Sequence, residues 1–114
     1  MSEDRVFLSY ILECITNVED LTRNGREAFE AAKHDQAAAL YYLQTMAETT
    51  QRLSDTVKAT QPEIDWIAIS GFRNRLVHGY LQVNMDVVWS VVENYLPDLK
   101  RAVTAMLENL EGSS

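Results

Sequence analysis

Residues 7–21 of the chain read FLSYILECITNVEDL, and this stretch indicates the fold class. Its apolar residues recur every four or three positions: Phe7, Ile11, Cys14, Val18 and Leu21. That spacing predicts one apolar stripe along a helix of about 18 residues. Asn24 and Gly25 interrupt the pattern and predict the end of this helix.

The helical spacing continues on the C-terminal side of this break. A short helix is expected at 26–33, with Phe29 as its main apolar residue. Asp35 can cap a third helix that continues to about Thr60. Pro62 disfavours a helical conformation in the residue before it, so this helix should stop there.

Two more helices are predicted in the second half of the chain. Asp65 can cap one that runs to about His78, and Gly79 can end it in the left-handed conformation that glycine tolerates. The last begins at Asn84 or Asp86, and Pro97 must kink it or begin a new segment. The chain is therefore predicted to be all-α, an antiparallel bundle with four long helices and one short helix.

The composition limits the class of protein further. The chain has 114 residues, 17 of them acidic and 10 basic, which leaves a formal charge of −7. This length predicts a single domain over 1–111 and a flexible tail at 112–114. The acidic N-terminus lacks the basic start of a signal peptide, and no apolar run approaches the ~20 residues that span a bilayer. We expect a soluble cytoplasmic protein with no membrane segment.

The same composition excludes several kinds of chemistry. The negative charge argues against a general nucleic-acid coat, but it permits an enzyme that acts on RNA through a small basic cleft. The two His and one Cys lack metal-site spacing, and no Gly-rich loop could cradle phosphates, so we expect neither metal nor cofactor. Cys14 is expected to be a buried structural thiol, and His34 a surface residue near the end of the second helix.

Residues 71–80, GFRNRLVHGY, stand apart because basic and aromatic residues are concentrated there. Asn74, Arg75 and His78 share one helix face by their spacing of three and four. Arg73 and His78 are five residues apart, roughly 140° around an ideal helix. One helix alone would not aim both at the same atom, so a long Arg side chain, a helix ending at Gly79 or a second subunit would have to close the gap.

This residue set could cleave RNA without metal. The 2′-hydroxyl attacks the adjacent phosphorus, and a His can take or give the protons at neutral pH. Arg supplies a permanent positive charge for the phosphoryl oxygens, and Asn74 could orient the ribose or the His. The alternative is that Arg73 and Arg75 pair with the acidic surplus while His78 merely ends a helix; the spacing alone favours this alternative.

Beyond these arguments, the segment resembles the HepT family of minimal HEPN-domain toxins. Arg73, His78 and Tyr80 match its R-x4-H-x-Y signature. Residues 62–66, PEIDW, are similar to its Pro-acidic-Ile-x-Trp lead-in, and 83–89 to its sequel. Residues 43–49, LQTMAET, resemble its L-x-x-I-G-E-A helix, with Ala47 and Thr49 in place of Gly and Ala.

The resemblance implies a HEPN helical bundle and a metal-independent ribonuclease that acts as a homodimer. Both catalytic motifs would face one cleft, with Arg73 and His78 as the catalytic pair and Asn74 as their polar neighbour. Tyr80 would be the regulatory residue, modified with AMP by an MntA-type minimal nucleotidyltransferase antitoxin. An AMP ester there would fill the cationic pocket and block RNA.

Other residues near the motif keep two interpretations each. Trp66 and Trp89 are expected to pack around the motif helix rather than stack on RNA. Glu48 could orient Arg73 or be solvated. Arg75 could bind phosphate, although a surface role is slightly favoured.

Three hypotheses for function follow from the sequence. The first is a ribonuclease toxin of a HepT/MntA-type pair. The second is a HEPN-like bundle that serves only as the binding partner of a nucleotidyltransferase. The third is a purely structural helical dimer.

Overall fold

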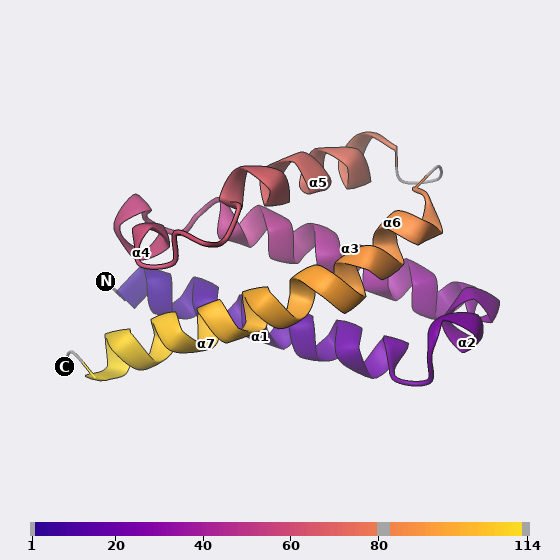
Figure 1. Cartoon of the computed structure of the whole chain (residues 1–114), viewed down its shortest axis with the longest axis horizontal. Coiled ribbons are helices and arrows are strands. Elements are labelled where there is room, and N and C mark those ends of the chain that lie inside the picture. Colours follow the sequence, from indigo (N-terminus) through magenta and orange to yellow (C-terminus); the bar gives the residue numbers. More distant parts are fainter. Residues whose placement is uncertain (1, 80–82, 113–114) are drawn as a thin grey trace.

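The computed structural model describes residues 2–79 and 83–112, and no strand occurs among them. It confirms the all-α fold class (Figure 1). The helices are α1 (Ser2–Thr22), α2 (Arg26–Ala31), α3 (Lys33–Thr50), α4 (Asp55–Ala59), α5 (Trp66–His78), α6 (Met85–Ser90), the π-helical turn η2 (Val91–Tyr95) and α7 (Leu96–Gly112). Tyr80 and the tail residues 113–114 lie outside the described residues.

The predicted stripe of α1 forms the centre of the core. Ile11, Cys14 and Val18 are fully buried, together with Leu8 and Ile15. Burying an aliphatic side chain of this size contributes about 1.5–3 kcal/mol. Because α1 packs against both α3 and α7, this stripe holds the bundle together.

The long helices alternate in direction through the bundle. Figure 1 shows the chain reversing from α1 to α3, from α3 to α5, and from α5 to the α6–α7 rod. Helix α5 lies at the edge, where it packs chiefly against α3. Its inner side carries the fully buried Leu76 and the partly buried Ile69 and Phe72. The outer side of α5 is therefore left open.

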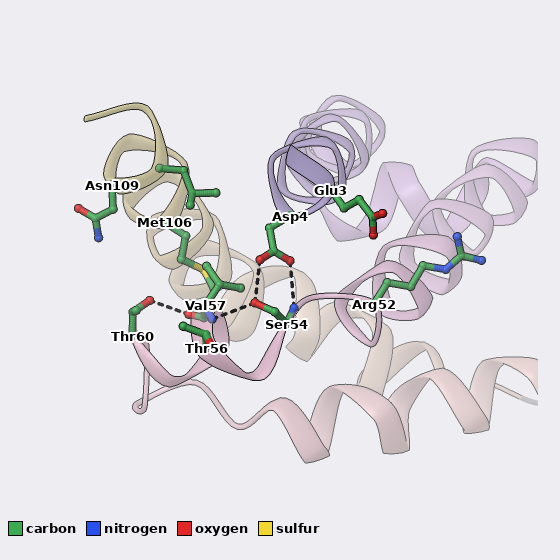
Figure 2. Close-up of a pocket in the computed structure, with 10 residues that line it drawn as sticks. Glu3, Asp4, Arg52, Ser54, Thr56, Val57, Thr60, Met106 and Asn109 are labelled. Atoms are coloured by element: carbon green, nitrogen blue, oxygen red, sulfur yellow. Dashed lines mark hydrogen bonds between the residues drawn. The ribbon is translucent and has the colours of Figure 1, made fainter. Parts of the chain in front are cut away.

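One predicted helix is shorter than the sequence pattern suggested. The third helix was expected to reach about Thr60, but α3 ends at Thr50 and a separate short helix, α4, follows. The cause is a contact from α1, shown in Figure 2. The buried carboxylate of Asp4 accepts hydrogen bonds from Ser54 N at 3.0 Å and Ser54 Oγ at 2.7 Å. Ser54 Oγ in turn accepts from Val57 N, so Ser54 caps α4.

Smaller differences occur at other helix ends. The second helix ends at Ala31 rather than at Lys33. Asp35 lies in the first turn of α3 and does not cap it, because Ala32 occupies the cap position. The predicted cap at Asn84 is confirmed, since its side chain accepts from the backbone N–H of Asp86.

The proline in the last helix is accommodated without breaking the rod. Pro97 lies in the first turn of α7. Of the two expected outcomes, a kink or a new segment, the second is therefore confirmed. The π-helical turn η2 comes directly before it, and Leu96 N–H bonds back to the carbonyl of Val91. This wider turn joins α6 to α7 continuously.

Gly25 marks the break between α1 and α2, as predicted, with φ of 96° and ψ of 170°. This backbone region is essentially restricted to glycine. Gly25→Ala should therefore lower the free energy of unfolding by about 1–3 kcal/mol, measured by chemical denaturation. Asn24→Ala is the matched control, since no residue other than glycine has positive φ in the described chain. A change under about 0.5 kcal/mol for Gly25→Ala would contradict this account of the turn.

Candidate active site

Helix α5 presents the motif residues, and local interactions fix both its start and its packing. The side chain of Asp65 accepts from Ala68 N at 2.9 Å and caps the helix, as predicted. Trp66 Nε1 donates to the carbonyl of Lys58 at 3.3 Å. Trp66 therefore packs and hydrogen-bonds within the fold, as expected for it. Trp89 packs against Phe29, with ring centroids 5.9 Å apart.

The end of α5 differs from the expectation in its conformation. Gly79 ends the helix, and its N–H bonds to the carbonyl of Arg75 at 2.9 Å. Its φ is −134°, however, so the predicted left-handed conformation is wrong. A Cβ at this position would lie 3.2 Å from the carbonyl oxygen of Arg75. Close approach of the backbone, rather than positive φ, is what favours glycine here.

Arg73 points from α5 toward α3 and meets Glu48. Its Nη2 lies 3.7 Å from Glu48 Oε2, and its Nη1 donates to Asn74 Oδ1 at 3.1 Å. Glu48 Oε1 also accepts from Gln44 Nε2 at 3.2 Å. Ion pairs this exposed contribute only about 0–1 kcal/mol to stability. The arrangement therefore restricts the orientation of the guanidinium more than it stabilises the fold.

The hydrogen bonding of Arg73 is incomplete within the chain. Its Nε is buried and has no hydrogen-bond partner among the described residues. A buried donor left unpaired costs about 1–3 kcal/mol, so such groups call for an explanation. The guanidinium is held by Glu48 and Asn74 but is partly exposed, so its outer N–H groups can still bind the oxygens of a phosphate.

His78 and Arg75 lie on the opposite, solvent-exposed side of α5. The side chain of Arg75 forms no ion pair within 2–79 and 83–112. Half of the ten basic residues do form ion pairs in those ranges: Arg23, Arg26, Arg73, Lys100 and Arg101. A free positive charge therefore accompanies His78 at the end of the helix.

The structure thus brings together some of the candidate residues and separates others. Arg73 contacts Asn74 and Glu48, while exposed His78 and Arg75 share the helix face of Asn74 and point away from Arg73. The five-residue separation of Arg73 and His78 places them on different faces of a regular helix, as the spacing predicted. The sequence did not lead us to predict Gln44 as a partner of Glu48, although residues four apart on a helix are close enough to contact each other.

Two further residues lie outside the candidate site. Cys14 is 1% exposed, and burial raises the pKa of its thiol, which disfavours the reactive thiolate. His34 is exposed but lies in the first turn of α3, not near the end of the second helix as expected. Within the described ranges no three His, Cys, Asp or Glu side chains gather as a metal site would require.

A cleft of about 630 Å³ opens at the opposite end of the bundle. Figure 2 shows it between the start of α1, the α3–α4 turn and α7. Its lining includes Asp4 and Ser54 but neither Arg73 nor His78. In the described part of the chain, no helix is long and apolar enough to cross a membrane.

The described helices form an all-α fold consistent with a HEPN helical bundle, and Arg73 and His78 lie five residues apart on its edge helix α5. A family model described as "Ribonuclease HepT-like" matches residues 11–106. The chain belongs to this HepT-like ribonuclease family. The matched range includes Arg73, His78 and Glu48.

Several similar proteins have names that describe them as ribonucleases. The chain is 32% identical over 95 residues to "Probable ribonuclease HepT" of Thermococcus cleftensis, covering 82% of this chain and 86% of that protein. It is 26% identical over 109 residues to "Putative RNase MJ0127" of Methanocaldococcus jannaschii, covering 95% and 90%. It is also 26% identical over 109 residues to "Putative RNase TTE0752" of Caldanaerobacter subterraneus, covering 95% and 97%. No solved structure matches the chain.

Proposed function

We propose that this chain is the metal-independent ribonuclease toxin of a HepT/MntA-type toxin–antitoxin pair, acting in the cytoplasm. The observation that carries the proposal is Arg73 held by Glu48 on the helix that ends at exposed His78, in a chain of the HepT-like ribonuclease family. His78 and Arg73 are the two catalytic residues. Asn74, Glu48 and Arg75 assist them.

The proposed reaction is cleavage of an RNA phosphodiester bond by the 2′-hydroxyl group of the adjacent ribose. The 2′-oxygen attacks phosphorus while its proton is removed, and the 5′-oxygen leaves with a proton. One product then ends in a 2′,3′-cyclic phosphate. His78 transfers a proton, and the Arg73 guanidinium stabilises the charge that develops on the phosphoryl oxygens. Glu48 is a positioning residue, because it touches Arg73 rather than the substrate.

The proposed active form is a homodimer. Arg73 pairs with Glu48 on α3, and its spacing from exposed His78 corresponds to roughly 140° around α5, which favours a site completed by a second chain. The outer side of α5 also leaves Ile67 85% exposed. A second copy on this side would bring a second motif to the first and cover the apolar residue.

The direct test is RNA cleavage by the purified protein in excess EDTA. The mass of the preparation is checked first, because AMP on Tyr80 would imitate an inactive enzyme. Cleavage that leaves 2′,3′-cyclic phosphate ends is the expected result. Unmodified dimer that cleaves neither tRNA nor mRNA would contradict the proposal.

Tyr80 is the proposed control point. An MntA-type nucleotidyltransferase would join the phenolic oxygen to the α-phosphorus of ATP and release pyrophosphate. Coexpression with that partner should increase the protein mass by one or more AMP groups located on Tyr80, and Tyr80→Phe should prevent it. An unmodified Tyr80 beside an active transferase and ATP would count against this regulation.

The alternative is a non-catalytic HEPN partner of a nucleotidyltransferase. The formal charge of −7 favours it, because a net negative chain repels RNA. This alternative predicts a stable complex with the transferase. It also predicts no RNA cleavage by the chain alone or by the complex.

Arg75 gives a prediction about substrate binding. Its side chain is exposed and forms no ion pair in the described ranges, so it is available to an RNA phosphate. Arg75→Gln should weaken RNA binding roughly tenfold and leave the cleavage step of bound RNA little changed. The slope of log K against log salt should fall by about 0.7 for one lost phosphate contact.

The matched control for Arg75 is Arg23→Gln. Arg23 is also exposed, but it pairs with Asp20 at the C-terminal end of α1. It should bind RNA with unchanged affinity and salt slope. Equal effects of the two substitutions would show that overall charge, not a local contact, matters.

A further inference from the structure

The position of the Arg73 guanidinium depends on a residue of another helix. Its Nη1 donates to Asn74 Oδ1, but Asn74 is the next residue of α5 and lies on the same helix. Glu48 belongs to α3, and its Oε2 lies 3.7 Å from Arg73 Nη2. This distance is longer than a normal N–H···O hydrogen bond, so the attraction is between charges and has little directional preference. The guanidinium is therefore oriented only as well as the Glu48 carboxylate is.

The Glu48 carboxylate is in turn held by Gln44, one helical turn earlier. The Glu48 side chain is 42% exposed, so the pair with Arg73 competes with water for it. Gln44 is half-buried, and its Nε2 donates to Glu48 Oε1 at 3.2 Å. A hydrogen bond to an ionised acceptor is stronger than one between neutral groups. Gln44 thus binds one carboxylate oxygen while the other faces Arg73.

A neutral donor suits this position better than a cation. A Lys at position 44 would form an ion pair with Glu48 four residues on and would compete with Arg73 for the carboxylate. Gln44 binds the carboxylate without neutralising it, so the whole negative charge remains for the guanidinium. Residues 36–47 of α3, QAAALYYLQTMA, contain no charged side chain, so this stretch supplies no competing cation.

We propose that Gln44 is a positioning residue of the ribonuclease: it fixes the Glu48 carboxylate, which in turn orients Arg73 toward the phosphoryl oxygens of RNA. A donor that is oriented before the reaction need not be ordered during it, which lowers the barrier. This inference rests on the proposed function, in which Arg73 stabilises the developing charge. It adds a residue that acts two contacts away from the phosphate.

The first test is single-turnover RNA cleavage by Gln44→Met in excess EDTA. Met has a similar length and helix propensity but lacks the N–H donor. Cleavage at saturating RNA should be about tenfold slower, because Arg73 is less well oriented. The dissociation constant for RNA should stay within about twofold, because the overall charge is unchanged. Gln51→Met is the control at an exposed position, the C-cap of the same helix, and should keep the wild-type rate.

A double variant shows whether Gln44 acts through Glu48. Glu48→Ala should slow cleavage by itself, and adding Gln44→Met should then have no further effect, because the contact that Gln44 makes is already lost. A further slowing of more than about threefold in the double variant would overturn the inference, since Gln44 would then act independently of Glu48.

A spectroscopic signal of Arg73 tests the positioning without RNA. Arg73 Nε is buried, so its N–H should exchange slowly with water and give a separate ¹H–¹⁵N signal, assigned by its absence in Arg73→Lys. Gln44→Met should speed this exchange, while the side-chain signals of Arg26 and Arg101 stay unchanged as internal controls. Gln51→Met should leave all three signals unchanged.

The inference and the proposed function can fail independently. A wild type that cleaves no RNA, but whose Arg73 signal responds to Gln44→Met, contradicts the ribonuclease proposal and supports the orienting contact. A wild type that cleaves RNA contradicts the inference alone if Gln44→Met keeps its cleavage rate within about twofold, or if its Arg73 signal is unchanged.

Discussion

His78→Ala should lower the rate of RNA cleavage by about 100- to 10,000-fold, the range over which a general acid or base contributes. The side chain is exposed in the last turn of α5, so its removal leaves no cavity in the core. Helical content and unfolding temperature should therefore stay close to wild type. The measurement is single-turnover cleavage in excess EDTA, with circular dichroism on the same samples.

The chain supplies its own control for this substitution. His34 is the other of the two His residues and is also exposed, but it lies in the first turn of α3. His34→Ala should cleave RNA at the wild-type rate. A His78→Ala protein that remains within about threefold of wild type would remove His78 from the proposed chemistry.

The bundle could be predicted from local patterns because most of its helices follow one apolar spacing. The α1 stripe at Ile11, Cys14 and Val18 is buried as its spacing of three and four indicated. The break after Thr50 could not be predicted in this way. It involves Asp4, fifty residues earlier, whose carboxylate accepts hydrogen bonds from Ser54, the residue that caps α4. A contact so distant in sequence leaves no periodic signal.

The same limit applies to the candidate site. The spacing of Arg73 and His78 correctly predicted that they face different directions on one helix. It left open whether Glu48 meets Arg73, because that depends on how α3 and α5 pack. The structure places their charged groups 3.7 Å apart. The pairing of Gln44 with Glu48 is local and was readable, but only the packing gives it a connection to Arg73.

The strongest test of a shared site uses two inactive variants together. Arg73→Ala should by itself lower cleavage by about 100- to 1,000-fold, the usual cost of removing a donor to the developing charge. Heterodimers of Arg73→Ala and His78→Ala are purified with two different affinity tags. If Arg73 of one chain acts with His78 of the other, each heterodimer has one intact site and should recover about half of the wild-type rate.

A site within a single chain makes the opposite prediction for the same sample. Each protomer of the heterodimer would then lack either Arg73 or His78, and the rate would stay at the level of the inactive parents. The proposed homodimer makes recovery the expected result, because Arg73 pairs with Glu48 on α3 while His78 is exposed on another side of α5. Tagged homodimers of each variant, carried through the same purification, establish the parental rates against which recovery is judged.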